Sequence, residues 1–541
     1  MLTKDEKNKF REELFRHLDG IAVAPVAFAL YEKGILDFIL KEKKVELSKL
    51  VETFTANEGY LNVGLRMLAS QGWLEYDIAS SEDVIVLEIN DRSTHAFELA
   101  VRYEEAVNFM KISAEFHPRH FEQDQFSHLN RIFNKYKKGE YAPTSEDPEK
   151  HKLEAQVEKH IEGVLVGPIT VFLGMDGMFH KYFMEASFSA DEFHEDPENF
   201  SKILDFFTYL GWFQKKKENY RFTEHGLFFA RRSSAYGVTV SYIPTFRRVD
   251  ELMFGNALIF KSSIPSSHEI HVDREMNVWG SGGAHSAYFK KIDEIVISLF
   301  NKPIEEQPKG ILDMGCGNGA FLIHLFEVIE QRTKRGPMLD EHPLFLVGVD
   351  YNRAALKVTR ANLVKADIWA KVIWGDIGNP RQLEEDIQAN YDIDLCDLLN
   401  VRTFLDHNRP WEDPQKMEEL SASSSTGAFV SNGNRLANSV VEQNLKEHFE
   451  NWKPYIHRFG LLLIELHTLD PKVVAQNIGK TAATAYDATH GFSDQYILEL
   501  EVFNKVISEI GLFSVPSHAA KFPNNELATV SINYLIEKSN S

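Results

Sequence analysis

The chain has 541 residues, of which 43% are hydrophobic, 12% aromatic and 26% charged. This length excludes a single small module and predicts roughly three domains, and the composition excludes a collagenous, mucin-like or wholly disordered chain. Lys and Arg number 59 against 80 Asp and Glu, which gives a formal net charge of −21. Because such a charge repels a polyanion, nucleic acid is not expected as a partner.

Cysteine content and the N-terminal sequence bear on the compartment. Cys316 and Cys396 are the only two cysteines, too few for a disulfide framework, which fits a reducing compartment. The N-terminus, MLTKDEKNKFREELFRHL, is charged and amphipathic and has no apolar core of a signal peptide. We expect no later segment to reach the ~18 apolar residues of a bilayer span. We therefore expect a cytoplasmic protein without a membrane partner.

An internal repeat divides the N-terminal half. Residues 19–34 (DGIAVAPVAFALYEKG) and 162–177 (EGVLVGPITVFLGMDG) both begin with an acid and a Gly, followed by Pro and Gly at the same spacing. Each copy then reaches a helix that closes on Gly-Trp, at 72–73 and at 211–212. A Gly is expected there as the helix C-cap, and a candidate pair of short strands follows in both copies.

Helices that close on Gly-Trp before a strand pair resemble winged-helix modules. In many small-molecule methyltransferases such a module serves dimerisation and shapes the substrate chamber, so the resemblance implies a role of that kind and allows a homodimer. DNA binding is the alternative, which the net negative charge disfavours. The three consecutive lysines at 215–217 are interpreted as a solvated hairpin rather than a docking patch.

Changes in composition predict the domain boundaries. We expect winged-helix-like repeats over 1–102 and 161–261, joined by a helical connector over 103–160 that is rich in Glu, Lys and His. Residues 262–276 (SSIPSSHEIHVDREM) are polar and Ser-rich, as a linker should be. In the third domain, 277–541, strands alternate with helices, which predicts a parallel α/β sheet.

A glycine-rich turn follows the first strand of that domain. In ILDMGCGNGAF, Gly315, Gly317 and Gly319 lie between a buried strand and a helix, and Asp313 precedes them. Without a Cβ, the backbone can take positive φ and approach a ligand closely enough for its N–H groups to bind it. The turn is therefore a candidate nest for the polar tail of a cofactor.

Two more acids end the next two strands. Asp350 in VGVDYN is placed to accept hydrogen bonds from ribose hydroxyls, and Asp376 in VIWGDIGNP to accept the exocyclic amine of an adenine. This set resembles class I S-adenosylmethionine methyltransferases, and it implies a Rossmann-like α/β sheet behind a mostly helical region of two winged-helix-like repeats. Residues 526–538 suit the antiparallel edge of such a sheet. An NAD-binding domain is the alternative, disfavoured because its fingerprint is Gly-x-Gly-x-x-Gly.

Four further motifs resemble a narrower family. They are NVWGSGGAHSAYF (277–289), NVRTFLDHNRPW (400–411), GLLLIELHTLDP (460–471) and THGFSDQYILELEVF (489–503), and together they are similar to the AprA-related methyltransferases. That family includes methyltransferase domains of polyketide loading modules, which methylate malonyl groups on a carrier protein with help from a mononuclear metal. The resemblance implies C-methylation of a malonyl-type or related acyl acceptor, small or carrier-bound, in secondary metabolism.

The resemblance also puts forward His467 and Gln495 as metal ligands, with His490 a third ligand or an acid–base group. A cation would act as a Lewis acid on an enolate, and imidazole, amide and water ligands would suit iron or manganese better than a closed zinc site. The alternative roles are structural: His467 would cap a strand end, Gln495 a helix, and His490 would orient its loop.

Three more residues complete the predicted site. Arg402 or Arg409 would clamp a malonyl carboxylate bidentately, although an internal salt-bridge cluster would have the same sequence. Ser281 lies in a segment expected to fold over the cofactor, and its alternative role is a helix N-cap.

Two other functions stay open. One keeps the cofactor and makes the acceptor a hydroxyl or carboxylate, with His490 as the general base of an O-methyltransferase. The other is not enzymatic: the tandem winged helices bind DNA or a partner protein, and the α/β domain senses a ligand.

Overall fold

The computed structural model describes residues 2–79, 83–113, 123–181, 187–261 and 269–537. The chain forms two compact units that exchange segments along the sequence. The first comprises Met1–His285, Val430–Arg435 and Asp470–Ser493, and the second comprises Ser286–Phe429, Leu436–Leu469 and Asp494–Ser541. The predicted linker lies outside the described residues over 262–268, and its last three residues already belong to helix α15 (Arg274–Phe300). The other predicted boundaries stay predictions.

Two long helices, α1 (Lys4–Glu32) and α8 (Pro148–Met175), form the centre of the first unit. They touch at the glycine of each copy of the repeat: a Cβ on Gly20 would lie 2.2 Å from the Cα of His160, and one on Gly163 would lie 2.4 Å from the Cα of His17. Only glycine permits this approach of two backbones. The repeated acid-Gly pair therefore marks the crossing of the two helices.

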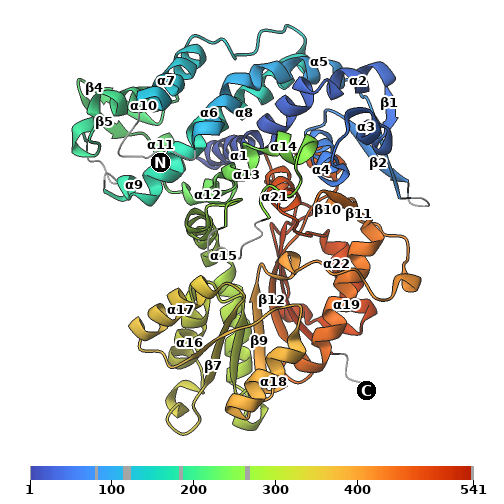
Figure 1. Cartoon of the computed structure of the whole chain (residues 1–541). Helices are drawn as coiled ribbons and strands as arrows, with labels where there is room; N and C mark the ends of the chain where they lie inside the picture. The colour runs from blue at the N-terminus through green and yellow to red at the C-terminus, as the bar shows by residue number, and fades with distance from the viewer. Residues whose placement is uncertain (1, 80–82, 114–122, 182–186, 262–268, 538–541) are drawn as a thin grey trace. The chain divides into compact units, whose positions relative to one another are not determined.

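Each copy of the repeat ends in the predicted helix and strand pair, and Figure 1 shows the two strand pairs at opposite ends of this unit, with α1 and α8 between them. The glycines that follow the two helices, Gly72 and Gly211, have φ of +74° and +80°, and the adjacent Trp73 and Trp212 are buried. The predicted repeats are thus confirmed. The elements are α4 (Glu58–Ser70), β2 (Glu75–Ala79) and β3 (Val84–Glu88) in the first copy, and α10 (Pro197–Tyr209), β4 (Phe213–Lys216) and β5 (Asn219–Phe222) in the second.

Shorter helices complete the first unit, and β1 (Lys44–Glu46) pairs with β3. These helices are α2 (Ile35–Glu42), α3 (Leu47–Phe54), α5 (Ser93–Glu98), α6 (Glu104–Ser113), α7 (Gln123–Lys137), α9 (Met178–Lys181), α11 (Glu224–Ala230), α12 (Ser234–Ser241), α13 (Ile243–Phe246), α14 (Val249–Phe254), α20 (Pro471–Ala475) and α21 (Ala483–Gly491). Strands β10 (Phe429–Ser431) and β11 (Asn434–Leu436) form a separate hairpin.

Helix α1 is long and apolar enough, by length and composition, to cross a membrane. The expectation that no segment reaches this length is therefore wrong for α1. The most apolar stretch of the helix is 83% buried inside the protein, because α8, α4 and α21 pack against it. This is the environment of a core helix.

The second unit is an α/β domain around one sheet, with strand order β13-β15-β12-β9-β6-β7-β8 and β14 paired to β15. The five strands from β12 to β8 are parallel, and β15 is antiparallel to β12 and β13. The predicted parallel sheet with a terminal antiparallel strand is confirmed. The strands are β6 (Gly310–Met314), β7 (Phe345–Asp350), β8 (Lys371–Trp374), β9 (Leu398–Thr403), β12 (Leu461–Leu466), β13 (Leu512–Ser514), β14 (Ala520–Phe522) and β15 (Val530–Glu537).

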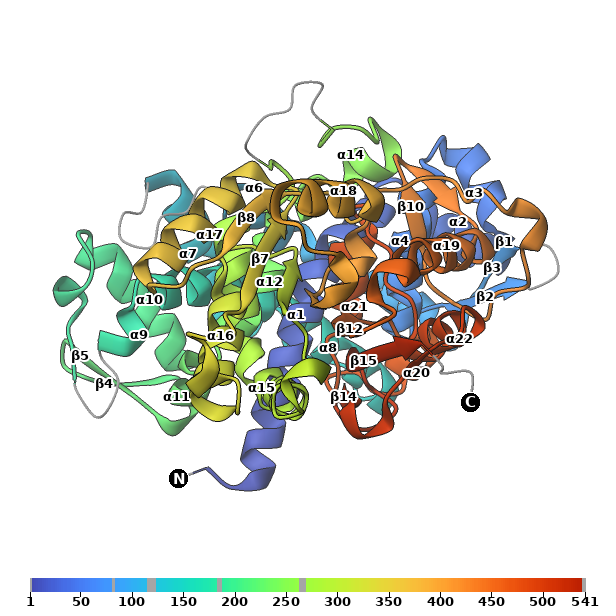
Figure 2. The same ribbon diagram turned by 90° about the horizontal axis from the view of Figure 1, so that it is seen from below.

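Helices cover both faces of this sheet, which is why every residue of β6 and β12 is buried. Figures 1 and 2 show α16 and α17 on one side and α18, α19 and α22 on the other. Parallel strands all point their carboxyl ends to one edge of the sheet, where ligands bind in folds of this type. The helices are α16 (Ala320–Arg332), α17 (Arg353–Lys365), α18 (Pro380–Tyr391), α19 (Asn438–Ile456) and α22 (Leu500–Glu509).

Candidate functional site

The glycine-rich turn joins β6 to α16 at the carboxyl edge of the sheet. Gly315, Gly317 and Gly319 have φ of +80°, +55° and +79°, a region that side chains rarely adopt. A Cβ on Gly315 would lie 3.0 Å from Leu405, so this glycine is needed for packing. A Cβ on Gly317 would meet nothing closer than the carbonyl oxygen of Gly315, at 4.0 Å. The middle of the turn therefore borders open space, as a cofactor cradle requires.

Asp350 and Asp376 lie at the ends of the two neighbouring strands, β7 and β8. Asp350 accepts hydrogen bonds from the backbone N–H of Gly317 at 3.0 Å and of Asn352 at 2.8 Å, one on each carboxylate oxygen. It thus fixes the turn as well as facing the cofactor edge. Asp376 accepts from the N–H of Gly378 at 2.8 Å. The three predicted acids lie at or near the carboxyl ends of three adjacent parallel strands. Each carboxylate oxygen has a second lone pair that can accept a hydrogen bond from a ligand.

Asp313 is 2% exposed, and its Oδ2 has no hydrogen-bond partner among the residues that the structure describes. Burial, followed by the nearby charge of Asp350, raises the pKa of Asp313 to about 7. A cationic ligand at the turn would relieve both effects, because it would pair with the buried carboxylate. S-adenosylmethionine is such a ligand, since it carries a sulfonium and an ammonium group. The residues of the turn thus fit this cofactor.

Arg402 lies on β9 and forms an internal ion pair through Nη1, while its Nε and Nη2 have no hydrogen-bond partner among the described residues. Its Nη1 is 2.5 Å from Oδ1 of Asp406, and its guanidinium lies 3.9 Å above the ring of Trp452. His448 donates to the same oxygen of Asp406 at 2.8 Å. Burial raises the pKa of Asp406, but Arg402 and His448 outweigh it and lower the pKa to about 2. This is the salt-bridge cluster that the sequence left as an alternative.

Arg409 is the better-placed of the two predicted arginines. Its Nε donates to Asn444 at 2.6 Å and its Nη1 to the backbone oxygen of Asp406 at 2.8 Å. Its Nη2 is buried and has no hydrogen-bond partner within the described part of the chain. Arg409 lines a small cavity, which Arg402 does not. The cavity has a volume of about 10 Å³, room for about one water molecule, so the site must open before an anionic group can reach this guanidinium.

His407 and Glu465 form a pair on the same cavity that the sequence did not predict. The Nδ1 of His407 is hydrogen-bonded to Oε1 of Glu465, and the backbone N–H of His407 donates to Oε2 at 3.3 Å. Because a carboxylate only accepts, Nδ1 carries the proton and Nε2 is the basic nitrogen. An imidazole oriented in this way by a carboxylate has the arrangement of a general base. The available signal was the cluster of charged residues after β9.

The cavity and the glycine-rich turn lie at the same edge of the sheet. Strand β9 pairs with β6 on one side and with β12 on the other, all in parallel. Leu405, two residues before His407, is the side chain that packs against Gly315. A methyl donor in the turn and an acceptor beside His407 would therefore occupy adjacent parts of one edge.

His467 and Gln495, the predicted metal ligands, are both buried in the second unit. The Nδ1 of His467 lies 3.1 Å from the carbonyl oxygen of Leu498, and its Nε2 lies 2.7 Å from Oγ of Ser531. A carbonyl only accepts, so Nδ1 donates to Leu498 and Nε2 accepts from the Ser531 hydroxyl. Burial also lowers the pKa of His467 to about 4. With both nitrogens engaged, His467 in this geometry does not fit a metal ligand.

Ser281 and His490 belong to the first unit, whereas the other predicted residues belong to the second. Ser281 lies inside α15, where its hydroxyl donates to the carbonyl oxygen of Val278 at 3.2 Å, so its alternative role as an N-cap is wrong. The Nδ1 of His490 lies 2.7 Å from the carbonyl oxygen of Tyr486, one helical turn earlier in α21. The roles of both residues in cofactor binding and catalysis stay predictions.

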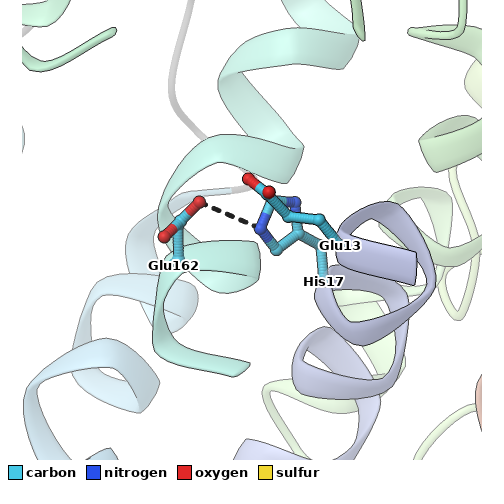
Figure 3. A group of neighbouring side chains, drawn as sticks. All are labelled: Glu13, His17 and Glu162. Carbon is cyan, nitrogen blue, oxygen red and sulfur yellow. Dashed lines mark hydrogen bonds and ion pairs between the residues drawn. The ribbon is translucent and has the colours of Figure 1, made fainter. Parts of the chain in front are cut away.

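A second polar cluster, Glu13, His17 and Glu162, lies between α1 and α8, with His17 and Glu162 buried and Glu13 partly exposed (Figure 3). Within the described ranges it is the only group of three His, Cys, Asp or Glu residues whose ligand atoms all lie within 4.8 Å. However, the ammonium of Lys159 lies 2.7 Å from Glu162 and 3.5 Å from Glu13. The lysine thus provides the positive charge, and we assign the cluster to stabilisation of the helix crossing.

Family profiles match most of the chain. A profile described as an AprA MT2-like methyltransferase domain matches residues 269–533, an AprA winged helix domain matches 162–256, and an AprA N-terminal domain matches 10–76. No curated protein is similar to the chain in sequence at a significant level.

The solved structures that this chain resembles have low sequence identity to it and low TM-scores. An O-methyltransferase family protein from Burkholderia thailandensis is 10% identical, with a TM-score of 0.39, over 70% of this chain and 95% of its own. The mitomycin 7-O-methyltransferase MmcR is 10% identical, with a TM-score of 0.40, over 71% and 99%. The CurJ carbon methyltransferase is 12% identical, with a TM-score of 0.30, over 79% and 98%.

Proposed function

The chain belongs to the AprA-related family of S-adenosylmethionine-dependent methyltransferases, and we propose that it methylates the acidic carbon of a malonyl-type acyl thioester. The observation that carries this proposal is the cavity that Arg409 shares with the His407–Glu465 pair. The cavity places a buried cation, which suits a carboxylate, beside an oriented base, which suits an acidic C–H. Its volume of about 10 Å³ is too small for an acyl group, so the proposal includes an opening of the site when the substrate binds. Polyketide or related secondary metabolism is the proposed setting.

The reaction follows from these groups. Arg409 binds the malonyl carboxylate through Nη2, which has no partner among the described residues. His407 takes a proton from the carbon between the two carbonyl groups, and Glu465 stabilises the imidazolium that forms. The carbanion then attacks the methyl group of the cofactor: a C–C bond forms, the S–C bond breaks, and the sulfur keeps the electron pair. The proton on His407 passes to solvent.

Metal assistance by iron or manganese, which the family resemblance implies at His467 and Gln495, meets an obstacle in the hydrogen bonds of His467 to Leu498 and Ser531. No step of the proposed reaction passes through a metal. We therefore expect methyl transfer to survive dialysis against a chelator. Loss of activity on chelation, restored by iron or manganese but not by Mg²⁺, would contradict this part of the proposal.

An O-methyltransferase is the second candidate, and the His407–Glu465 pair also favours it. An oriented imidazole can take a proton from a hydroxyl as well as from carbon. The two candidates differ at Arg409, because a neutral hydroxyl acceptor gives the unpaired Nη2 no charge to bind.

The decisive experiment supplies methyl-labelled S-adenosylmethionine with malonyl-pantetheine or with hydroxylated acceptors, and locates the label by mass spectrometry. We expect label on the malonyl carbon, a fall in kcat of about a hundredfold or more in His407→Ala, and a raised KM for the malonyl substrate in Arg409→Gln. His457→Ala, an exposed histidine of the same unit, is the matched control and should keep full activity. Label on oxygen would support the second candidate.

A further inference from the structure

The exposed face of α17 is strongly basic, in contrast to the chain as a whole. The helix carries four cations and no acid (RAALKVTRANLVK), whereas the protein has a formal net charge of −21. Lys371, the first residue of β8, adds a fifth cation. All five side chains are exposed, and among the described residues none has an acid as its ion-pair partner. Arg360 donates to the backbone oxygen of Val372, and the ammonium of Lys371 lies over the ring of Tyr391. We call them the basic stripe: Arg353, Lys357, Arg360, Lys365 and Lys371.

An apolar groove lies at one end of the basic stripe. It is lined by residues from the starts of β7 and β8 and from the end of α17, mostly apolar ones such as Phe345, Val364 and Trp369. One acid, Asp367, and one cation of the stripe, Lys371, also line it. Trp369 is 90% exposed and Val364 is 80% exposed. Tryptophan is rarely left in water without a function, because burying its ring is strongly favourable and tryptophan is enriched where proteins bind one another.

The other end of the basic stripe reaches the cofactor edge. Arg353 follows Asp350, the acid at the end of β7, by three residues. A 13-residue helix such as α17 is about 20 Å long. The stripe therefore leads from the groove at the amino ends of β7 and β8 to the carboxyl ends, where the glycine-rich turn lies.

A second copy of this chain is a poor occupant for this surface. Strand β8 is at the edge of the sheet, but the guanidinium of Arg360 donates to the backbone oxygen of Val372 in β8 at 2.7 Å. This contact occupies a group that an added strand would need, and Lys371 places a charge on the same edge. A second acidic copy would also need an acidic patch complementary to the stripe.

We propose that the basic stripe and the groove dock an acidic carrier protein that delivers the acyl acceptor on a flexible thioester arm. This inference rests on the proposed function, since it names the partner that presents the malonyl group. An acidic helix along α17 would pair with the unneutralised cations, and an apolar side chain of the carrier would cover Trp369. Complementary charge of this kind sets the rate of association and the choice of partner. The thioester arm would then extend past Arg353 to the cofactor edge.

The test measures binding separately from catalysis. A fluorescently labelled acyl carrier protein, acidic and loaded with a malonyl group, is titrated with the full-length protein at low and at moderate salt. We expect the Kd for the carrier to rise by roughly tenfold in Lys357→Glu/Lys365→Glu and to rise in Trp369→Ala. Binding by the unmodified protein should weaken as salt is added. Lys216→Glu/Lys217→Glu, two exposed lysines of the first unit with the same change of charge, should bind as the unmodified protein does.

Activity on malonyl-pantetheine, which has no carrier, separates this inference from the proposed function. The α17 double variant should methylate this small thioester at the normal rate and lose efficiency only on the carrier-bound form. Methylation of malonyl-pantetheine together with unchanged carrier binding by the variants would overturn the docking surface and leave the function standing. Charge-dependent carrier binding without methylation of either thioester would overturn the proposed function and leave the docking surface standing. A DNA duplex that binds the stripe in place of the carrier would also overturn the inference.

Discussion

At the scale of a single residue, we expect Asp313 to couple cofactor binding to pH. Burial, reinforced by Asp350, raises the pKa of Asp313 to about 7, so this carboxyl is largely protonated at acidic pH. Only the ionised form attracts the positive charges of S-adenosylmethionine. We therefore expect affinity for the cofactor to fall as pH is lowered below about 7, approaching tenfold per pH unit.

Calorimetric titrations between about pH 5 and pH 7 would measure this dependence. Asp313→Asn should bind the cofactor more weakly at pH 7, with a flatter profile below it, because the amide does not titrate. A profile for Asp313→Asn as steep as that of the unmodified protein would show that another group is responsible.

Local motifs predicted individual residues well, and long-range pairs were missed. Gly315, Gly317 and Asp350 have the predicted placement, with positive φ in the turn and a carboxylate at the end of β7, because each position follows from a motif within one segment. Their roles in cofactor binding stay predictions. The His407–Glu465 pair joins residues 58 positions apart, and no pattern in either segment indicates the partner. His467 was expected to bind a metal, but Ser531, on a strand 64 positions later, engages its Nε2. The sequence therefore could not predict which residues of other strands form hydrogen bonds with the side chains of the site.

At the scale of elements, the crossing of α1 and α8 depends on two glycines. A Cβ at Gly20 or Gly163 would overlap the backbone of the opposite helix, and backbone cannot move aside as a flexible side chain can. We expect Gly20→Ala and Gly163→Ala each to lower the free energy of unfolding by about 3 kcal/mol, the upper end of the usual cost of overpacking. Chemical denaturation of the full-length protein is the measurement.

Gly282→Ala is the matched control for this prediction. Gly282 is exposed in α15, and a Cβ there would meet nothing within 4 Å. Alanine favours a helix over glycine, so this variant should be as stable as the unmodified protein or more stable by up to about 1 kcal/mol. Equal stability of the Gly20 and Gly282 variants would mean that the helices do not cross as closely as described.

At the scale of the whole molecule, part of the sequence within the predicted α/β domain folds as part of the helical first unit. Residues 470–493 follow β12 but belong to the first unit. There Asp487 pairs with Arg66, and Thr484 accepts a hydrogen bond from Gln71 at 3.0 Å. The sequence predicted one continuous domain over 277–541, because composition does not change within it.

A fragment of residues 286–541 would therefore leave α21 without its partners. We expect this fragment to aggregate or to unfold at a markedly lower temperature than the full chain, because buried apolar and charged groups of α21 would be exposed. Replacement of residues 471–492 by a short Gly-Ser linker should restore solubility to the fragment. If the unaltered fragment unfolds cooperatively at the temperature of the full chain, residues 470–493 do not depend on the first unit.

Binding of S-adenosylmethionine to the full-length protein tests the central claim most directly. Calorimetry should show one molecule bound per chain, with affinity reduced by roughly tenfold or more in Asp350→Ala, which removes charged hydrogen-bond acceptors. Asp340→Ala, an exposed acid of the same unit, should bind as the unmodified protein does. Absence of binding to the unmodified protein, or equal affinity in Asp350→Ala, would contradict the assignment of the glycine-rich turn and its acids as the cofactor site.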